Sequence, residues 1–223
     1  MRIESVRFDA SGNPTFVVTG GISFFIPLSR CAELLASLPD GKDSQLIALA
    51  ALPDSVPEFG SEDDFFMLLA SIDEEQRARR KVIELCARAE QSSHGLSAKL
   101  VAKGFSSKAA KAAIESLKTD GVVDDARFAR IWARGRAERR AAGPALLAAE
   151  LRSRGLGEGA VKAALEDIDF SRALARAIGK ETARLEGAWR KKGLRKDERF
   201  HDALYWALKK QGFDPEAIRE ALQ

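Results

Sequence analysis

The sequence has 223 residues, 45% of them hydrophobic and 31% charged, so the chain is long enough to bury a core of one or two domains. Its two cysteines lie far apart, which excludes a disulfide-rich scaffold and a Cys-x-x-Cys metal site. Residues 1–75 hold 4 Lys or Arg and 13 Asp or Glu, whereas residues 76–223 hold 32 and 20. The first region is acidic and the second is basic, which predicts that the second binds an anionic partner, either nucleic acid or an acidic protein groove. A solvated helical surface would have the same composition.

The first part of the chain has an uncharged stretch, residues 10–29, of nearly membrane-spanning length. It contains glycines and prolines throughout, and these exclude a spanning helix. The opening residues Met1-Arg2-Ile3-Glu4 do not have the pattern of a secretory signal. We therefore expect a cytoplasmic protein that does not enter a membrane.

Residues 3–8, 15–19 and 22–27 have the pattern of short strands, and Gly20-Gly21 between the second and third is a hairpin signal. A small sheet is marginal in water and must pack against other elements. Helices predicted at residues 28–38, 45–52 and 62–72 are the candidates, with leucines such as Leu34 and Leu49 covering one face.

One pattern occurs three times, around Gly104, Gly155 and Gly212. In each copy two leucines four residues apart precede the glycine, an apolar residue follows it directly, and an alanine and a further apolar residue stand nine and ten positions after it. Such leucines line one helix face, and the glycine fits the left-handed position that ends the helix. We predict a positive φ at each glycine. A triplicated unit is typical of a repeat protein, while an ordinary helical bundle is the alternative.

From residue 73 onward the pattern is almost entirely helical, with a charged helix at residues 74–90 and Ser92 or Ser93 capping the next one. The predicted fold is mostly α-helical: three tandem three-helix repeats in an elongated array, preceded by a small β-hairpin and short helices. The predicted parts are residues 1–72, acidic strands and short helices; 73–121, repeat 1; 122–168, repeat 2; and 169–223, repeat 3.

No group of residues in the sequence supports catalysis. The two histidines, His94 and His201, suit structural or surface positions, and the common nucleophile, phosphate-loop and zinc motifs are absent from the sequence. Asp124 is better explained as a helix cap than, with Asp125, as a metal ligand. We expect no enzyme activity, no catalytic residue, no metal and no cofactor.

Basic side chains form the candidate binding surface. Arg127, Arg130 and Arg134 fall on one stripe of their predicted helix. Arg136 and Arg140 form a second stripe, and both are expected to face solvent, away from Phe128, Ile131 and Trp132. Such a surface suits phosphates or a row of carboxylates. Trp132 and Tyr205 have the pattern of packed residues, whereas Trp189 and Trp206 stay open. The candidate residues are Arg127, Arg130, Arg134, Arg136, Arg140, Arg152, Arg154, Lys191 and Lys192.

The block Gly121-Val122-Val123-Asp124-Asp125-Ala126-Arg127-Phe128-Ala129 closely resembles the Gly-hydrophobic-Asp-Asp-x-Arg-Phe-Ala block of the RecX family. Glu90, Ser92, Leu96, Lys99-Leu100 and Lys103-Gly104-Phe105 are similar to the family's preceding pattern, and Gly143-Pro144 fits its next turn. Ala89, Gln91, Ser93 and Gly95 depart from residues common in the family. The resemblance covers about residues 74–223.

The resemblance implies a cytoplasmic modulator of RecA, acting in recombination, DNA repair and the SOS response. It implies binding along the groove of the RecA-DNA filament, which limits filament extension and lowers ATPase, strand-exchange and coprotease activities. Two alternatives stay open. One is a module that uses the same basic stripes to bind single- or double-stranded DNA without sequence preference, and the other is a neutral helical-repeat adaptor for another protein.

Overall fold

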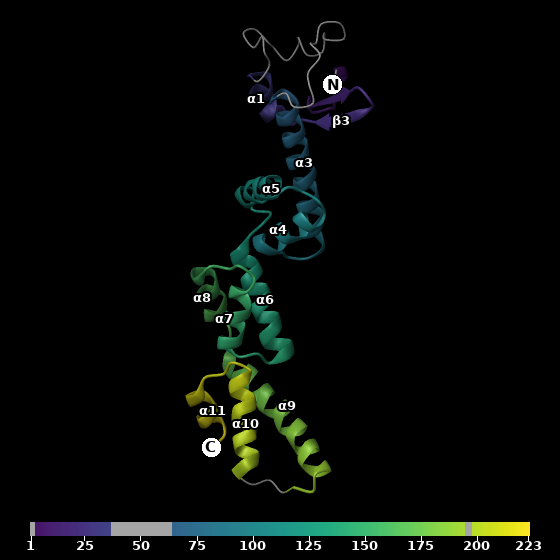
Figure 1. Cartoon of the computed structure of the whole chain (residues 1–223). Helices are drawn as coiled ribbons and strands as arrows, with labels where there is room; N and C mark the ends of the chain where they lie inside the picture. Colours follow the sequence, from purple (N-terminus) through teal and green to yellow (C-terminus); the bar gives the residue numbers. More distant parts are fainter. Residues whose placement is uncertain (1–2, 37–63, 195–197) are drawn as a thin grey trace. The chain divides into compact units, whose positions relative to one another are not determined.

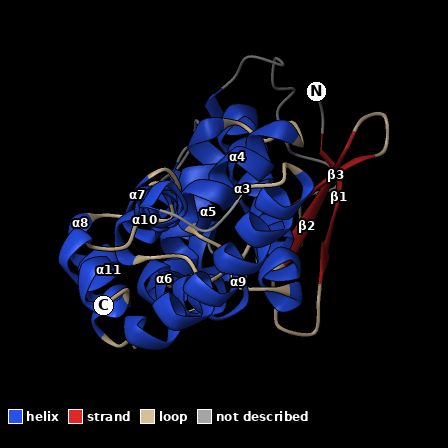
Figure 2. Cartoon of the chain, turned by 90° about the horizontal axis from the view of Figure 1, so that it is seen from below, coloured by secondary structure: helices blue, strands red, loops and turns tan. Residues whose placement is uncertain are grey.

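The computed structural model describes residues 3–36, 64–194 and 198–223, and the helix predicted at 45–52 lies outside them (Figure 1). The described chain is mostly helical, with one small three-stranded sheet near its N-terminus (Figure 2). This confirms the predicted mostly α-helical class with an N-terminal hairpin.

The sheet consists of β1 (Ile3–Phe8), β2 (Pro14–Val18) and β3 (Ile22–Phe25), all antiparallel in the order β1-β2-β3. Gly20 and Gly21 join β2 to β3 with φ values of 93° and 76°, which only glycine adopts without strain. The predicted two-glycine hairpin is therefore confirmed.

One face of the sheet is buried against helix α3 (Asp64–Arg88). Phe16, Val18 and Ile26 are fully buried there with Leu69 and Ile72 of α3. Of the single helix predicted at 28–38, the described residues 28–36 form two short helices, η1 (Leu28–Arg30) and α1 (Cys31–Ala36). Leu34 joins the same core, as expected. The core therefore ties the N-terminal strands to the first long helix.

Asp73 makes the polar link between the sheet and α3. Its side chain is 9% exposed; one oxygen accepts the N–H of Phe25 at 3.0 Å and the other pairs with Arg77 at 2.8 Å. Because this N–H belongs to the edge strand β3, the carboxylate also occupies a donor that another strand would use.

The two helices predicted at 62–72 and 74–90 are one continuous helix, so that separation is wrong. No glycine or proline occurs between Asp64 and Arg88, and nothing in the local sequence stops the helix. The predicted boundary between residues 72 and 73 lies inside α3. The division of the chain at that point stays a prediction.

From α3 onward the described helices form three sets of three, as predicted, and in each set the first helix is the longest. In the first two sets the third helix packs against the first: α5 against α3, and α8 against α6. In the last set α10 packs against both α9 and α11. The helices are α4 (Ser93–Ala102), α5 (Ser107–Thr119), α6 (Asp125–Arg140), α7 (Pro144–Arg152), α8 (Glu158–Glu166), α9 (Phe170–Lys191), α10 (Glu198–Lys210) and α11 (Pro215–Ala221).

The three register glycines end α4, α7 and α10 in the same way. Their φ values are 89° at Gly104, 77° at Gly155 and 87° at Gly212, which confirms the predicted left-handed turns. The residue after each glycine donates its N–H to the second leucine of the pattern, as a Schellman motif requires. These bonds join Phe105 to Leu100 at 3.2 Å, Leu156 to Leu151 at 3.3 Å and Phe213 to Leu208 at 3.4 Å.

The chain forms two compact units. The first comprises Met1–Arg88 with Leu96–Val122, and the second comprises Ala89–Gly95 with Val123–Gln223. In the second unit one buried cluster lies among α6, α7 and α8 and another among α9, α10 and α11, with Phe170 packed against both. The candidate arginines and lysines all belong to this second unit.

Candidate partner-binding surface

Helix α6 carries five of the candidate residues, and Asp124 positions its first turn. The Asp124 carboxylate accepts the N–H groups of Ala126 and Arg127, both at 2.9 Å. The Arg127 N–H bond, with the Ala126 bond and the positive charges of Arg127 and Arg130, lowers the pKa of Asp124 below its ordinary value. Asp124 therefore acts as the helix cap that the sequence predicts.

Asp125 and Arg127 attach the start of α6 to residues 90–93. The Asp125 carboxylate accepts the N–H and the hydroxyl of Ser93 at 2.7 and 2.6 Å, and Arg127 Nε donates to Glu90 at 2.6 Å. Asp125 thus satisfies a free N–H at the beginning of α4. The block that carries the family resemblance therefore joins the start of α6 to residues 90–93. Arg127 is held by Glu90 and does not point freely into solvent.

Arg136 also departs from the expected solvent-facing stripe. Its side chain is 25% exposed and makes a two-point ion pair with Glu150 of α7, through Nε at 3.0 Å and through Nη2. Arg154 donates to the Glu150 carbonyl at 2.9 Å. Both guanidinium groups lie over the Trp132 ring, at 5.4 Å for Arg136 and 4.3 Å for Arg154. These two arginines join α6 to α7, and Glu150 is the partner that sequence reasoning missed.

The buried face of α6 differs from the predicted one. Ala129, Ala133 and Ala137 are buried, whereas Ile131 is 56% exposed. Phe128 and Trp132 are partly buried beside the alanines. A stripe of alanines lets α8 approach α6 closely, so the largest apolar side chains are displaced to the margins of the contact.

Arg130, Arg134 and Arg140 are the candidate residues of α6 that lie exposed. Arg130 and Arg134 are one helical turn apart, so their side chains project from neighbouring points on one face. Ile131 stands beside them with its side chain in solvent. Two exposed cations and an exposed apolar residue therefore share this part of α6.

Two arginines of α9 outside the candidate set lie near the Arg134 side chain. Arg134, Arg172 and Arg176 line one recess of about 250 Å³ together with Asp167 and Asp169. Arg172 pairs with Asp169 at 3.4 Å, and Arg176 donates to the carbonyl of Glu138 at 3.1 Å. The four-residue spacing of Arg172 and Arg176 was the available signal, since it puts both on one helix face.

The other candidates lie in different places. Arg152 is exposed at the end of α7 and pairs with Glu158 at 2.5 Å, which raises its pKa. Lys191 and Lys192 are exposed at the far end of α9. About 19 helical residues separate Lys191 from Arg172, or roughly 30 Å along the axis. The nine candidates therefore form separate groups rather than one patch.

The aromatic residues left open by the sequence have different environments. The Trp189 ring meets Phe200 edge-on, with centroids 5.6 Å apart, and joins the core of the last helices. Trp206 is 60% exposed, and the Lys209 ammonium lies 4.7 Å from its ring centre. Tyr205 is packed against the same core, as expected.

Metal clusters and membrane-spanning helices are both absent from the described ranges. Residues 3–36, 64–194 and 198–223 contain no group of three or more His, Cys, Asp or Glu placed to hold a metal. Across these ranges, no helix combines the length and the apolar character needed to cross a bilayer.

Comparison with known proteins gives consistent matches. Residues 124–165, which include α6 and α7 and nearly all of α8, match the family model described as RecX, second three-helix domain. A regulatory protein RecX from Halorhodospira halophila is 34% identical over 149 residues, covering 66% of this chain and 86% of the relative. The regulatory protein RecX of Treponema pallidum strain Nichols is 31% identical over 144 residues, covering 63% and 80%.

Solved structures share the fold. A crystal structure of regulatory protein RecX aligns with a TM-score of 0.69 over 98% of this chain and 97% of the other, at 14% identity. The crystal structure of RecX from Lactobacillus salivarius aligns with a TM-score of 0.57 over 68% and 96%, also at 14% identity. From the sequence relatives and the matching domain model, the chain belongs to the RecX family of regulatory proteins.

Proposed function

We propose that this protein regulates RecA by binding in the groove of the RecA-DNA filament, where it limits filament extension and so lowers ATPase, strand-exchange and coprotease activities. It acts by binding rather than by catalysis. The observation that carries the proposal is the exposed pair Arg130 and Arg134 on the helix at the start of the matched RecX domain. A row of carboxylates on a protein filament would complement this pair.

From the contacts of the second unit we infer three groups among the candidate residues. Arg127, Arg136 and Arg154 hold α6 in place through Glu90, Glu150 and Trp132. Arg130, Arg134 and Arg140 are left to meet the partner, with Arg172 and Arg176 beside Arg134. Arg152, Lys191 and Lys192 supply additional positive charge away from this group.

The test is the DNA-stimulated ATPase of the cognate RecA, measured with and without the protein. Substoichiometric protein should lower ATP hydrolysis, because one blocked filament end prevents many subunits from joining. Arg130→Glu with Arg134→Glu should remove the effect without unfolding the protein, since exposed charges contribute little to stability. Lys108→Glu with Lys111→Glu, on exposed positions of α5, is the matched control and should inhibit like wild type.

Added DNA separates this proposal from simple DNA binding. A protein that only competes for DNA is titrated away by excess DNA, and its affinity falls steeply with salt. A filament binder follows the filaments. An unchanged ATPase at equimolar wild-type protein contradicts the proposal and favours an adaptor for another partner.

A further inference from the structure

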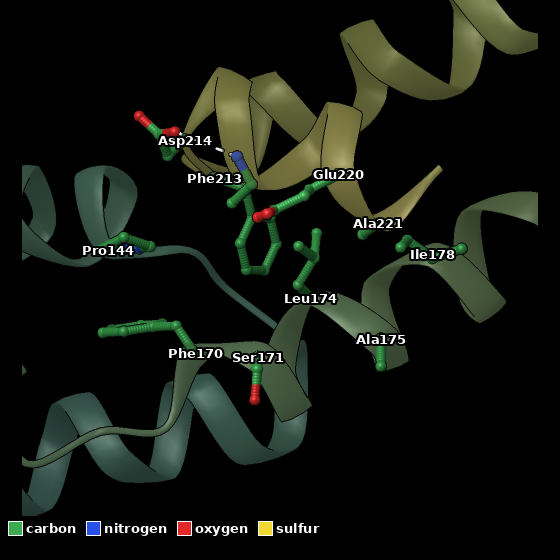
Figure 3. A pocket seen from close by; sticks show the side chains of 11 residues that line it. Pro144, Phe170, Ser171, Leu174, Ala175, Ile178, Phe213, Asp214, Glu220 and Ala221 are labelled. Atoms are coloured by element: carbon green, nitrogen blue, oxygen red, sulfur yellow. Dashed lines mark hydrogen bonds between the residues drawn. The ribbon is translucent and has the colours of Figure 1, made fainter. Parts of the chain in front are cut away.

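Helices α9 and α11 border an open groove of about 590 Å³ in the last set of helices (Figure 3). Phe170, Leu174 and Ile178 recur every four residues along α9 and line one wall. Phe213, Ala217 and Ala221, again four apart, line the other. The α9 wall is therefore an apolar stripe of one helix face, and the other wall combines Phe213, which precedes α11, with two alanines of α11.

The groove exists because the last set of helices packs differently from the first two. In the first two sets the third helix lies against the first, α5 against α3 and α8 against α6. In the last set the third helix, α11, packs on the second, α10. The space that the first two sets fill with a direct helix contact is left between α9 and α11. The groove is therefore lined by the kind of apolar side chains that a helix-helix contact would otherwise bury.

The groove has a packed floor and an accessible rim. Leu174 and Phe213, at the buried side of the two walls, are only 6% and 4% exposed and belong to the same buried cluster. Ala175 and Ala221 are exposed at the rim. Because the floor residues already belong to the core, the groove is preformed, and a ligand can enter it without unfolding the helices.

The charged residues of the groove are acidic. Asp214 and Glu220 line it, and among the described residues no Lys or Arg does so. The Asp214 carboxylate caps α11 by accepting the N–H of Glu216 at 2.8 Å, and in Figure 3 the Glu220 side chain extends from α11 toward Phe213. On a unit otherwise rich in exposed cations, this acidic rim favours a positively charged ligand.

We propose that this groove binds a short amphipathic helix of a partner protein, one with apolar residues three or four positions apart and with Lys or Arg flanking them. Two apolar walls at helical spacing suit a helix laid into a groove. The acidic rim determines the charge of that helix. This inference does not depend on the proposed action on RecA.

Fluorescence anisotropy of the full-length protein with two labelled peptides tests the proposal. Both peptides are short helix formers with the same leucine spacing, and their flanking residues are Lys in one and Glu in the other. We expect the Lys peptide to bind at least about tenfold more tightly than the Glu peptide. Equal affinities, or no binding of the Lys peptide, contradict the proposal.

Two variants test whether the Lys peptide binds in the groove. Ala175→Arg puts a long cation on the exposed rim and should weaken the Lys peptide by at least about tenfold. Ala163→Arg, at an exposed position of α8 outside the groove, is the control and should leave the affinity unchanged. Wild-type affinity in Ala175→Arg contradicts the proposal. If that variant fails to fold by circular dichroism, Ala221→Arg on the opposite rim gives the same test.

A charge reversal tests the role of the rim. Glu220→Lys should weaken the Lys peptide and strengthen the Glu peptide, whereas Glu166→Lys on α8 should change neither. If Glu220→Lys leaves the ratio of the two affinities as in wild type, the acidic rim does not select the ligand and the proposal is wrong.

Discussion

Gly143 and Gly212 lie with their backbones in direct contact. The Gly143 N–H donates to the Gln211 carbonyl at 2.8 Å, and the Ala145 N–H donates to the Gly212 carbonyl at 3.0 Å. A Cβ on Gly143 would lie 2.5 Å from the Gly212 carbonyl carbon, which is too close for any side chain. The turn that ends α10 therefore accepts N–H groups at the start of α7 that have no partner within their own helix.

This contact predicts an order of stability among glycine variants. Gly104→Ala should cost about 1–2 kcal/mol, because its Cβ meets no neighbour and only the left-handed backbone is strained. Gly155→Ala adds a clash with the His94 side chain, which can move. Gly212→Ala should cost the most, since its Cβ meets the Leu146 backbone. Urea unfolding midpoints give the order, and three equal losses contradict it.

Arg136 and Glu150 should be strongly coupled in stability. Removing either partner leaves a partly buried charge unpaired, so each alanine variant should cost about 1–3 kcal/mol, and the double variant less than their sum. The exposed pair Arg152 and Glu158 is the control and should show little coupling. Urea unfolding of the two mutant cycles measures both. Equal coupling in the two cycles contradicts the assignment of Arg136 as a residue that holds α6 on α7.

Asp124 should make stability depend on acid pH. Its pKa is lowered in the folded state, so the stabilisation is present above the unfolded value near 3.9 and is lost as the pH falls through the folded value. Asp124→Ala should cost about 1 kcal/mol at pH 7, and the difference from wild type should shrink below about pH 4. Urea midpoints between pH 7 and pH 3 test this. Asp167→Ala, at the C-terminal end of α8, is the control for loss of an exposed carboxylate. If the stability loss in Asp124→Ala does not change with pH, the assignment of Asp124 as a cap is wrong.

The boundary predicted at residue 73 leads to a truncation experiment. A chain starting at Asp73 keeps the part of α3 with buried Ala78 and Val82, and we expect it to stay helical with α5 still packed against α3. It loses Phe66, Leu69 and Ile72 with the sheet they cover, so its melting temperature should fall. Circular dichroism measures both. An unfolded fragment would mean that the sheet is an integral part of the first unit.

Local patterns predicted several elements correctly, because their causes are local. The two glycines of the hairpin, the Schellman turns at the three register glycines and the Asp124 cap depend on residues within a few positions of each other. Side-chain size, left-handed backbone and nearby hydrogen-bond acceptors are all readable from sequence.

The candidate surface was only partly predictable. Helical spacing put the arginines of α6 on stripes, and Arg130 and Arg134 are indeed exposed. Helical spacing does not show which arginine pairs with a carboxylate from another segment. Glu90 lies 37 residues from Arg127, and Glu150 lies 14 from Arg136.

The sequence by itself determined the helical class, the small sheet, the turn glycines and the family, because these follow from short-range spacing and composition. Only the tertiary structure decided which cations are free, that α3 is continuous, and that α9 and α11 leave an acidic apolar groove between them. These features depend on how helices pack and which distant side chains meet, and neither has a fixed spacing along the chain.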